Sequence, residues 1–527
     1  MEDLIDKRAP LQTDGARQRF LVNVSSNVLL IFAQIAVTLW LTPYLIGYLG
    51  IAAFGIIPLV NSVTSYMAVL TTALNSSVSR FLAIDLGQGD RIAANKTFNT
   101  ALLGLAGIIL VLSPAVLIIS FTFPDLFQVP PGYEKNASCL FAIVAVAFFV
   151  TVVGSNFAVS PFVHSRFLLS NLVNFAGLSA RLGFIVILFS IFQAQLWYAG
   201  GGILFGAVVS FVGYVILWRK LTPELGIHIK AFDRTRLHSF LSMGGWVVVN
   251  MLGAMLLGRV DLIVVNAYFG AAMTGGYGSV SQFSLLMEYL VSAAAIAVRP
   301  VILIKYAQRD FVGLQRLASQ AVKLLGLALA LPVGLLCGFA RPILMVWLGP
   351  SYDYLSNLLV VIVFHQSLNL SVRPLLDVQN AFNKVRWPGI ATLLSGAASL
   401  GLAIFLAMWG KWGTTGVAIA VAAAWTAKNA LYMPVYTARI MNLPWWAFLP
   451  TLSASVIGTF LVGSASYGLT LFRMPDDWLA LVGSVAAVSV VYALGVWAIG
   501  LNRADRELLK RIVPFQTAGT EAVLLVK

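Results

Sequence analysis

Charge is the scarcest property of this sequence. Lys, Arg, Asp and Glu make up only 10% of its 527 residues, whereas 59% of the residues are apolar. A soluble domain carries about 25% charged residues and needs them to cover its surface. So small a charged fraction excludes a soluble enzyme, a nucleic-acid-binding protein and a secreted scaffold. The sequence therefore predicts a protein that is embedded in a membrane.

Residues for metal, redox or nucleotide chemistry are also few. The chain has two cysteines, Cys139 and Cys337, and four histidines, none at a metal-ligand or disulfide-framework spacing. It has no Gly-rich nucleotide loop of the GxxxxGK[ST] type. His164 and His365 belong to no cluster of acids or histidines in the sequence. We therefore expect no catalytic residue, no metal, no cofactor and no enzymatic activity.

Long apolar runs dominate what is present. Fourteen segments are apolar over about the twenty residues that a helix needs to cross a bilayer. The first twenty residues contain Glu2, Asp3, Asp6 and Asp14, unlike a cleavable signal peptide, so we expect the first segment to remain as a signal anchor. The predicted spans are 20–47, 51–79, 97–121, 138–163, 168–193, 196–218, 240–268, 272–303, 318–340, 355–377, 388–409, 414–436, 446–471 and 478–500.

The distribution of Lys and Arg orients these spans. With a cytoplasmic N-terminus, the inner segments hold 23 basic residues, beginning with Lys7 and Arg8, and the outer segments hold four. Cytoplasmic loops of membrane proteins carry such an excess of basic residues. The charge distribution therefore predicts that both termini are cytoplasmic.

The chain repeats at an offset of about 220 residues. Tyr48-Leu-Gly50 matches Tyr268-Phe-Gly270, Asp90 matches Asp310, and Lys96 matches Arg316. An offset of six spans keeps both copies in the same orientation, which predicts two lobes related by a pseudo-two-fold axis along the membrane normal, around a central cavity. We expect glycines in the outer turns to adopt positive φ; they are Gly47, Gly50, Gly270 and Gly275.

The fold prediction is an all-α polytopic membrane protein of about fourteen transmembrane helices, in two six-helix lobes plus two C-terminal helices. Its predicted parts are a cytoplasmic tail (1–19), an N-terminal lobe (20–218), a cytoplasmic linker (219–239), a C-terminal lobe (240–440), the last two spans (441–501) and a cytoplasmic tail (502–527).

Three stretches carry a resemblance to a known family: LTPYLIGYLGIAAFGIIPLVNSV, NSSVSRFLAIDLGQGDRIAANKTF and GRVDLIVVNAYFGAAMTGGYGSVSQFSLL. The chain resembles, over about residues 18–440, the polysaccharide-exporter, oligosaccharide-lipid flippase (Wzx-like) branch of the multidrug/oligosaccharidyl-lipid/polysaccharide (MOP) exporter superfamily. The resemblance implies that the chain flips a polyprenyl-pyrophosphate-linked oligosaccharide to the outer leaflet of the bacterial inner membrane for cell-surface polysaccharide biosynthesis. Two lobes around a cavity predict a rocking, alternating-access mechanism, and polysaccharide polymerase machinery is a candidate partner.

Ionisable residues within the spans are candidate site residues, because a charge at bilayer depth is costly unless it lines a polar interior. Arg181, Arg259 and Lys428 lie well inside apolar runs. A guanidinium there suits bidentate contact with phosphate, although a packing role for Arg181 is an alternative. Near the inner ends of spans, we expect Arg80, Arg299 and Arg373 to contact substrate or lipid phosphate or to anchor their helices; Arg373 can also pair with Asp377 four residues later. Lys323 reads as a snorkelling side chain.

Two deep carboxylates, Asp261 and Glu288, are candidates for coupling to H+ or Na+. Asp261 is about 200° around the helix from Arg259, so we expect it to find another partner, such as Lys428. A drug/cation antiporter of the same superfamily is the alternative function. The positive interior disfavours it, because such a cavity attracts pyrophosphate and repels cationic drugs.

The last two spans contain no charged residue. Their small residues predict either a groove for the polyprenyl tail or close contact between helices, and stabilisation of the fold or of an oligomer alone is the alternative role of the pair. These residues are Ser453, Ser455, Gly458, Gly463 and Ser464.

Overall fold

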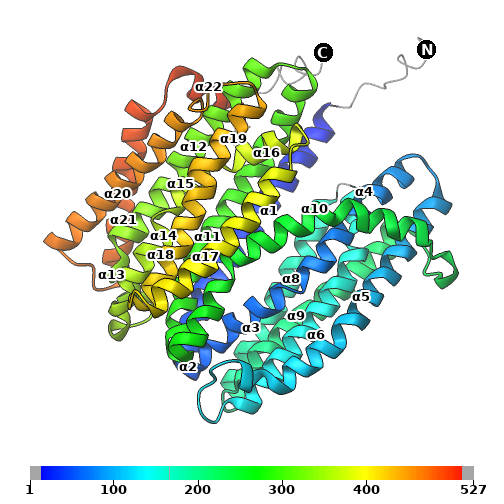
Figure 1. The fold of residues 1–527 in the computed structure, drawn as a ribbon, viewed down its shortest axis with the longest axis horizontal. Coiled ribbons are helices and arrows are strands. Elements are labelled where there is room, and N and C mark those ends of the chain that lie inside the picture. Colours follow the sequence, from blue (N-terminus) through cyan, green and yellow to red (C-terminus); the bar gives the residue numbers. More distant parts are fainter. Residues whose placement is uncertain (1–12, 165, 513–527) are drawn as a thin grey trace. The chain divides into compact units, whose positions relative to one another are not determined.

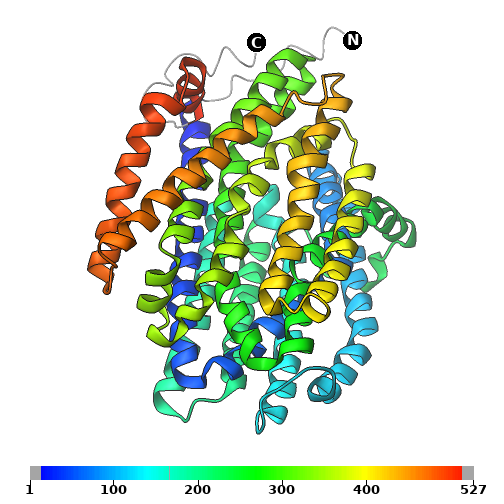
Figure 2. The same ribbon diagram turned by 60° about the vertical axis from the view of Figure 1, so that its left-hand side comes forward.

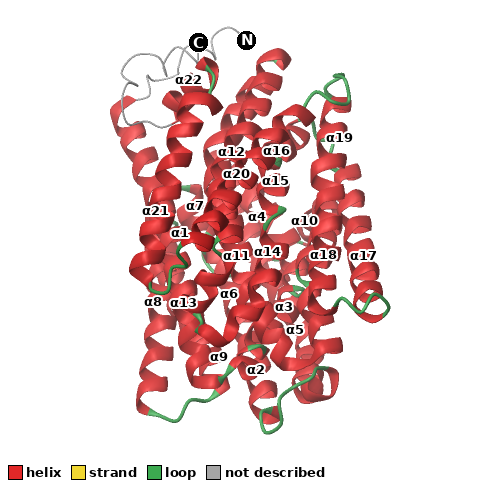
Figure 3. Cartoon of the chain, turned by 90° about the vertical axis from the view of Figure 1, so that its left-hand side faces the viewer, coloured by secondary structure: helices red, strands yellow, loops and turns green. Residues whose placement is uncertain are grey.

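The computed structural model describes residues 13–164 and 166–512, and these residues form helices and loops without a strand (Figure 3). Eleven helices of this part are long and apolar enough to cross a membrane. The prediction of an all-helical polytopic membrane protein is therefore confirmed. Residues 1–12, with Lys7 and Arg8, and residues 513–527 of the predicted tails lie outside the described part.

The predicted count of fourteen spans stays a prediction, because several predicted segments do not each correspond to one separate long helix. Segment 51–79 is divided into α2 (Ile51–Phe54), α3 (Ile56–Ser65) and α4 (Ala68–Gly87). Segments 240–268 and 272–303 both overlap one 45-residue apolar stretch, Val248–Ser292, which is kinked at Gly270 between them. Segment 414–436 is interrupted by a π-helical turn, Ala427–Tyr432.

The chain divides into two compact units. Unit 1 comprises Met1–Leu49 and Val63–Val248, and unit 2 comprises Gly50–Ser62 and Val249–Lys527. The predicted lobe boundaries stay a prediction. Unit 1 is built from α1 (Thr13–Leu49), α4, α5 (Arg91–Leu126), α6 (Glu134–Phe157), α7 (Val159–Val163), α8 (Phe167–Ile191), α9 (Leu196–Leu221), η1 (Ile229–Ala231) and most of α10 (Arg234–Gly258) (Figure 1).

Unit 2 contains the remaining helices. They are α2, most of α3, α11 (Val260–Ala307), α12 (Phe311–Gly338), α13 (Ala340–Trp347), η2 (Pro350–Leu355), α14 (Ser356–Val363), α15 (Gln366–Ser371), α16 (Arg373–Ala381), α17 (Arg386–Met408), α18 (Gly413–Thr426), η3 (Ala427–Tyr432), α19 (Met433–Ile440), η4 (Leu449–Leu452), α20 (Ser453–Phe472), α21 (Trp478–Gly495), η5 (Val496–Gly500) and α22 (Arg503–Ile512).

In unit 1 the predicted linker is held on the helical core. The Asn99 side chain donates to the carbonyl of Gly226 at 2.8 Å and accepts from the backbone N–H of His228 at 2.7 Å. The hydroxyl of Thr100 accepts from the backbone N–H of Asp233 at 2.9 Å. These bonds satisfy backbone groups of an irregular segment, so this part of the linker has a fixed path.

In unit 2 the short helices α2 and α3 pack on α11. Gly50 and Gly270, the two glycines matched by the sequence repeat, both have positive φ, 75° and 81°. Gly275 has a different role: a Cβ there would collide with the carbonyl oxygen of Ile51, so it allows close approach. Of the four glycines predicted to adopt positive φ, Gly47 and Gly275 do not.

The sequence repeat is also visible in how α5 and α12 begin. Asp90 accepts from the backbone N–H of Ala93 at 2.9 Å, and Asp310 accepts from that of Gly313 at 2.8 Å. Both carboxylates cap their helices, which leaves fewer backbone donors unsatisfied. The two residues stand at matching positions, 220 apart, with the same local structure.

The small residues of α20 make close helix contact. A Cβ on Gly458 would lie 2.8 Å from the Tyr492 hydroxyl and 2.9 Å from Cβ of Ala330, and α20 runs along α12 (Figure 2). Gly463 lies against Gly334 of α12. Ser455, Gly458 and Gly463 thus pack closely against neighbouring helices, whereas Ser453 and Ser464 are exposed.

Candidate functional site

The first two candidate residues of unit 2, Arg259 and Asp261, lie at the junction of α10 and α11. Arg259 is the half-buried residue before α11, and its carbonyl accepts from the hydroxyl of Ser62. Asp261 accepts from the Tyr277 hydroxyl at 3.0 Å and from the backbone N–H of Leu262 at 2.9 Å. The predicted pairing of Asp261 with Lys428 is therefore wrong: the carboxylate accepts from Tyr277, sixteen residues later in α11 and beyond the non-helical kink at Gly270.

Glu288 lies on α11 between two arginines. Its principal electrostatic neighbours are Arg259 and Arg373. No ion pair within 4.0 Å involves Glu288 in the described part of the chain. The Glu288 carboxylate is thus attracted by two arginines without a direct ion pair to either. Its side chain is also accessible, because the residue is exposed.

Asp377 pairs with a different arginine from the predicted one. Its carboxylate lies 3.7 Å from Nε of Arg299, while the nearby Arg373 contributes a weaker attraction. The Asp377 side chain is 11% exposed and that of Arg299 is 63% exposed. The suggested pairing of Arg373 with Asp377 within α16 is therefore wrong, and the partner comes from α11.

Lys428 is carried by the π-helical turn η3. Its ammonium lies 5.9 Å from the centroid of the Trp425 ring, a distance at which a cation is attracted to the ring face. Arg373 is its electrostatic neighbour. The adjacent Asn429 donates to the backbone carbonyl of Asn369 at 3.1 Å, which fixes this turn against α15.

The structure therefore brings together most of the candidate residues in unit 2. Arg259, Glu288, Arg373 and Lys428 form a chain of electrostatic neighbours, and Arg373 connects it to Asp377 and Arg299. The chemistry available is the binding of an anion between guanidinium groups, with carboxylates for cation exchange.

The other two candidates, Arg181 and Arg80, belong to unit 1. Arg181 is half-buried on α8, where its Cβ lies close to Gly206 of α9. Arg80 is exposed on α4. Their predicted roles in substrate binding stay predictions.

Two ion pairs escaped the sequence reasoning because their partners are far apart in the chain. Arg236 of the linker lies 2.7 Å from the buried carboxylate of Asp85, which also accepts from the Thr97 hydroxyl at 2.6 Å. Lys323 does not snorkel as predicted: its ammonium lies 2.6 Å from Asp505, which is 1% exposed. The sequence did contain a sign of the pair between Lys323 and Asp505, because Asp505 is an acid near the start of a basic amphipathic segment.

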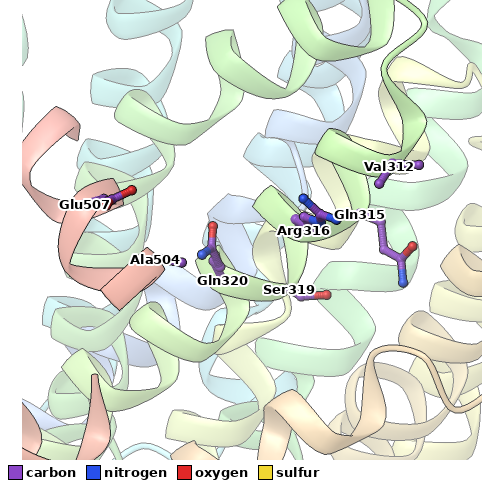
Figure 4. A pocket seen from close by; sticks show the side chains of 7 residues that line it. All are labelled: Val312, Gln315, Arg316, Ser319, Gln320, Ala504 and Glu507. Carbon is purple, nitrogen blue, oxygen red and sulfur yellow. The ribbon is translucent and has the colours of Figure 1, made fainter. Parts of the chain in front are cut away.

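A cavity of about 680 Å³ is lined by residues of α12 and α22 (Figure 4). Five of its seven lining residues are polar, and they include one cation and one carboxylate. The seven are Val312, Gln315, Arg316, Ser319 and Gln320 of α12, with Ala504 and Glu507 of α22. Among the described residues, no group of three or more His, Cys, Asp or Glu side chains could hold a metal ion.

Comparisons with known proteins bear on the fold. No protein-family model matches the chain. EpsK, an uncharacterized membrane protein of Bacillus subtilis (strain 168), is 29% identical over 494 residues, 94% of this chain and 98% of EpsK. The lipid II flippase MurJ, in an inward closed conformation, matches with a TM-score of 0.63 and 16% identity over 89% of this chain and 98% of its own. A MATE-family multidrug-resistance transporter of the MOP superfamily, inward-facing, matches with a TM-score of 0.59 and 15% identity over 86% and 99%.

The chain has the fold of this MATE-family transporter and of the lipid II flippase MurJ. The resemblance found in the sequence is thus confirmed at the level of the superfamily's fold. The oligosaccharide-lipid branch stays a prediction.

Proposed function

We propose that this chain is a flippase that moves a polyprenyl-pyrophosphate-linked oligosaccharide from the cytoplasmic to the outer leaflet of the bacterial inner membrane. The fold supports a transporter, because both a lipid II flippase and a multidrug transporter share it. Alternating access is the expected mechanism for two-unit transporters of this kind. Both termini would be cytoplasmic, and the product would be released near the polysaccharide polymerase.

The observation that carries the proposal is the excess of positive charge in unit 2. Four cations, Arg259, Arg299, Arg373 and Lys428, stand with three carboxylates. The uncharged Tyr277 hydroxyl donates to Asp261, Arg299 pairs with Asp377, and Glu288 has Arg259 and Arg373 as electrostatic neighbours, so the four cations exceed the three carboxylates by one. The remaining positive charge suits a pyrophosphate, which carries several negative charges.

The exposure of three charged side chains adds to this argument. Glu288, Arg299 and Arg373 are exposed in unit 2. A charged side chain facing acyl chains would cost several kcal/mol or more, so these side chains belong on a surface that water reaches. A polar head group can use the same surface while its polyprenyl tail remains in the bilayer.

The alternative, a drug/cation antiporter, has weaker support. A cationic drug would meet four basic side chains in unit 2, and like charge repels it. The buried Asp85 carboxylate of unit 1 is already paired with Arg236. Coupling to H+ or Na+ would use Asp261 or Glu288, the two carboxylates on α11.

Reconstitution tests the proposal directly. Proteoliposomes would carry a polyprenyl-pyrophosphate-linked disaccharide, and a glycosidase on one side would report the fraction that crosses. We expect wild-type protein to flip it, Arg373→Gln combined with Lys428→Gln to lose at least about tenfold in rate, and the control Arg341→Gln to behave as wild type. Arg341 is a suitable control because it pairs with Asp353 in an exposed ion pair. Uptake of a lipophilic cation without flipping of the lipid-linked sugar would favour the antiporter.

A further inference from the structure

One predicted span of unit 2 is broken where its side chains are most polar. The stretch Pro350–Ala381 consists of η2, α14, α15 and α16, with interruptions at His365 and at Val372. The facing helix α18 ends in the π-helical turn η3. Broken helices and π-turns at bilayer depth leave backbone groups for other partners and are frequent at functional sites.

Polar side chains from three helices meet at the first interruption. His365, Gln366 and Asn369 are 8%, 8% and 2% exposed. Gln366 donates to the Ser284 hydroxyl of α11 and to the carbonyl of Ile362. Asn369 lies 2.9 Å from Nδ1 of His365 and 3.0 Å from the hydroxyl oxygen of Thr426, the residue that precedes η3.

The direction of these hydrogen bonds follows from the chemistry of each group. The Thr426 hydroxyl donates its one hydrogen to the carbonyl of Ala422 at 2.7 Å, so it accepts from the Asn369 amide nitrogen. That nitrogen only donates, so its second hydrogen goes to Nδ1 of His365, which accepts. The arrangement therefore requires that Nδ1 of His365 carry no proton.

The junction also contains acceptors for a protonated ring. Oδ1 of Asn369 and Oε1 of Gln366 are buried and have no donor, and the carbonyl of Ile362 is an electrostatic neighbour of the imidazole. An unsatisfied buried acceptor costs about 1–3 kcal/mol. An imidazolium has two N–H donors, and the Ile362 carbonyl and a rotated Asn369 amide can accept them.

We propose that His365 is a proton-binding site and that Asn369 relays its protonation state to the π-helical turn that carries Lys428. A proton added at Nδ1 makes that nitrogen a donor, so the Asn369 amide turns about χ2 and presents Oδ1. The amide nitrogen then leaves the Thr426 hydroxyl, and η3 loses the hydrogen bond at its start. Its link to Lys428 rests on the proposed function; the proton site itself does not.

The charged groups around the junction come from every side. They are Glu288 on α11, Lys323 on α12, Arg373 at the start of α16 and Lys428 on η3. Glu288 is one turn from Ser284, and Lys323 is one turn from Gly326, which lies against Ser371. The sequences of α14, α18 and α20 contain no charged residue. None of the four charged groups is hydrogen-bonded or ion-paired to His365 in the part of the chain that the structure describes. Glu288 therefore favours the protonated ring, and the three cations oppose it.

Hydrogen–deuterium exchange of the substrate-free full-length protein tests the relay. After correction for intrinsic exchange, we expect the amides of residues 426–432 to exchange about fivefold faster at pH 5 than at pH 8, the factor that one hydrogen bond of about 1 kcal/mol represents. His365→Gln, which does not titrate, should abolish this pH response, and Asn369→Leu should abolish it with His365 intact. His164→Gln, at an exposed histidine of unit 1, is the matched control and should retain it.

An unchanged pH response in His365→Gln, or no response in the wild type, would overturn the proton site. The proteoliposome assay then separates the site from the function. If flipping depends on a pH gradient, His365→Gln should remove that dependence. If exchange responds as expected but no lipid-linked sugar moves, the proton site stands and the proposed function fails.

Discussion

The ion pair between Lys323 and Asp505 gives a quantitative test of how the C-terminal helix is attached. Asp505 accepts from Lys323 at 2.6 Å and from the backbone N–H of Asn502 at 3.2 Å. Asp505 is 1% exposed and the Lys323 side chain 26% exposed. Removing one partner of a buried pair costs about 3–5 kcal/mol, because the other charge stays buried without compensation. Since Lys323 is partly exposed, we expect about 3 kcal/mol for Asp505→Asn.

The double variant isolates the interaction. Lys323→Met with Asp505→Asn should recover most of the loss, because no charge is then left buried. The assay is thermal unfolding in detergent together with protease cleavage in α22, which should rise in Asp505→Asn and return towards wild type in the double variant. Additive losses, with a coupling energy below about 0.5 kcal/mol, would refute the pairing.

Three further predictions follow from single contacts. Gly275→Ala should destabilise the protein by about 1–3 kcal/mol, because its Cβ meets the Ile51 carbonyl, whereas Gly47→Ala, with open space around it, should be neutral in the same thermal assay. The hydrogen bond from Lys305 to Asp310 lowers the pKa of the Asp310 carboxyl below its ordinary value of 3.8. The ionised carboxylate therefore contributes to stability above about pH 4, and this contribution is lost as pH falls. In an acid titration, the stabilities of Asp310→Asn and wild type should converge at low pH. Arg181→Ala should abolish export of polymer while the protein stays inserted, and Arg181→Lys should restore it only in part, because an ammonium lacks the bidentate geometry; normal export from Arg181→Ala would remove that residue from the site.

Much of the fold could be predicted from local sequence. Apolar runs give the spans, and the Asp90 and Asp310 caps give the starts of two helices, because each depends on residues within a few positions. Gly50 and Gly270 were predictable for the same reason, since a tight turn between two spans needs positive φ.

The rest depends on contacts that no local pattern encodes. Lys323 meets an acid 182 residues away, and Asp377 meets Arg299 of another helix, so both were misassigned. The breaks at His365 and in η3 follow from packing between helices, which hydropathy does not report. The candidate cations of unit 2 were found because a charge in an apolar run is visible in the sequence, whereas the Tyr277 partner of Asp261 was not.

The central claim is that the chain flips a lipid-linked oligosaccharide, and one measurement tests it most directly. The gene would be deleted in its host, and polyprenyl-linked intermediates would be identified by mass spectrometry in right-side-out and inside-out membrane vesicles. We expect a complete oligosaccharide repeat unit on polyprenyl pyrophosphate to accumulate on the cytoplasmic face, and expression of the wild-type gene to clear it. An unchanged amount and sidedness of every lipid-linked intermediate in the deletion strain would contradict the account.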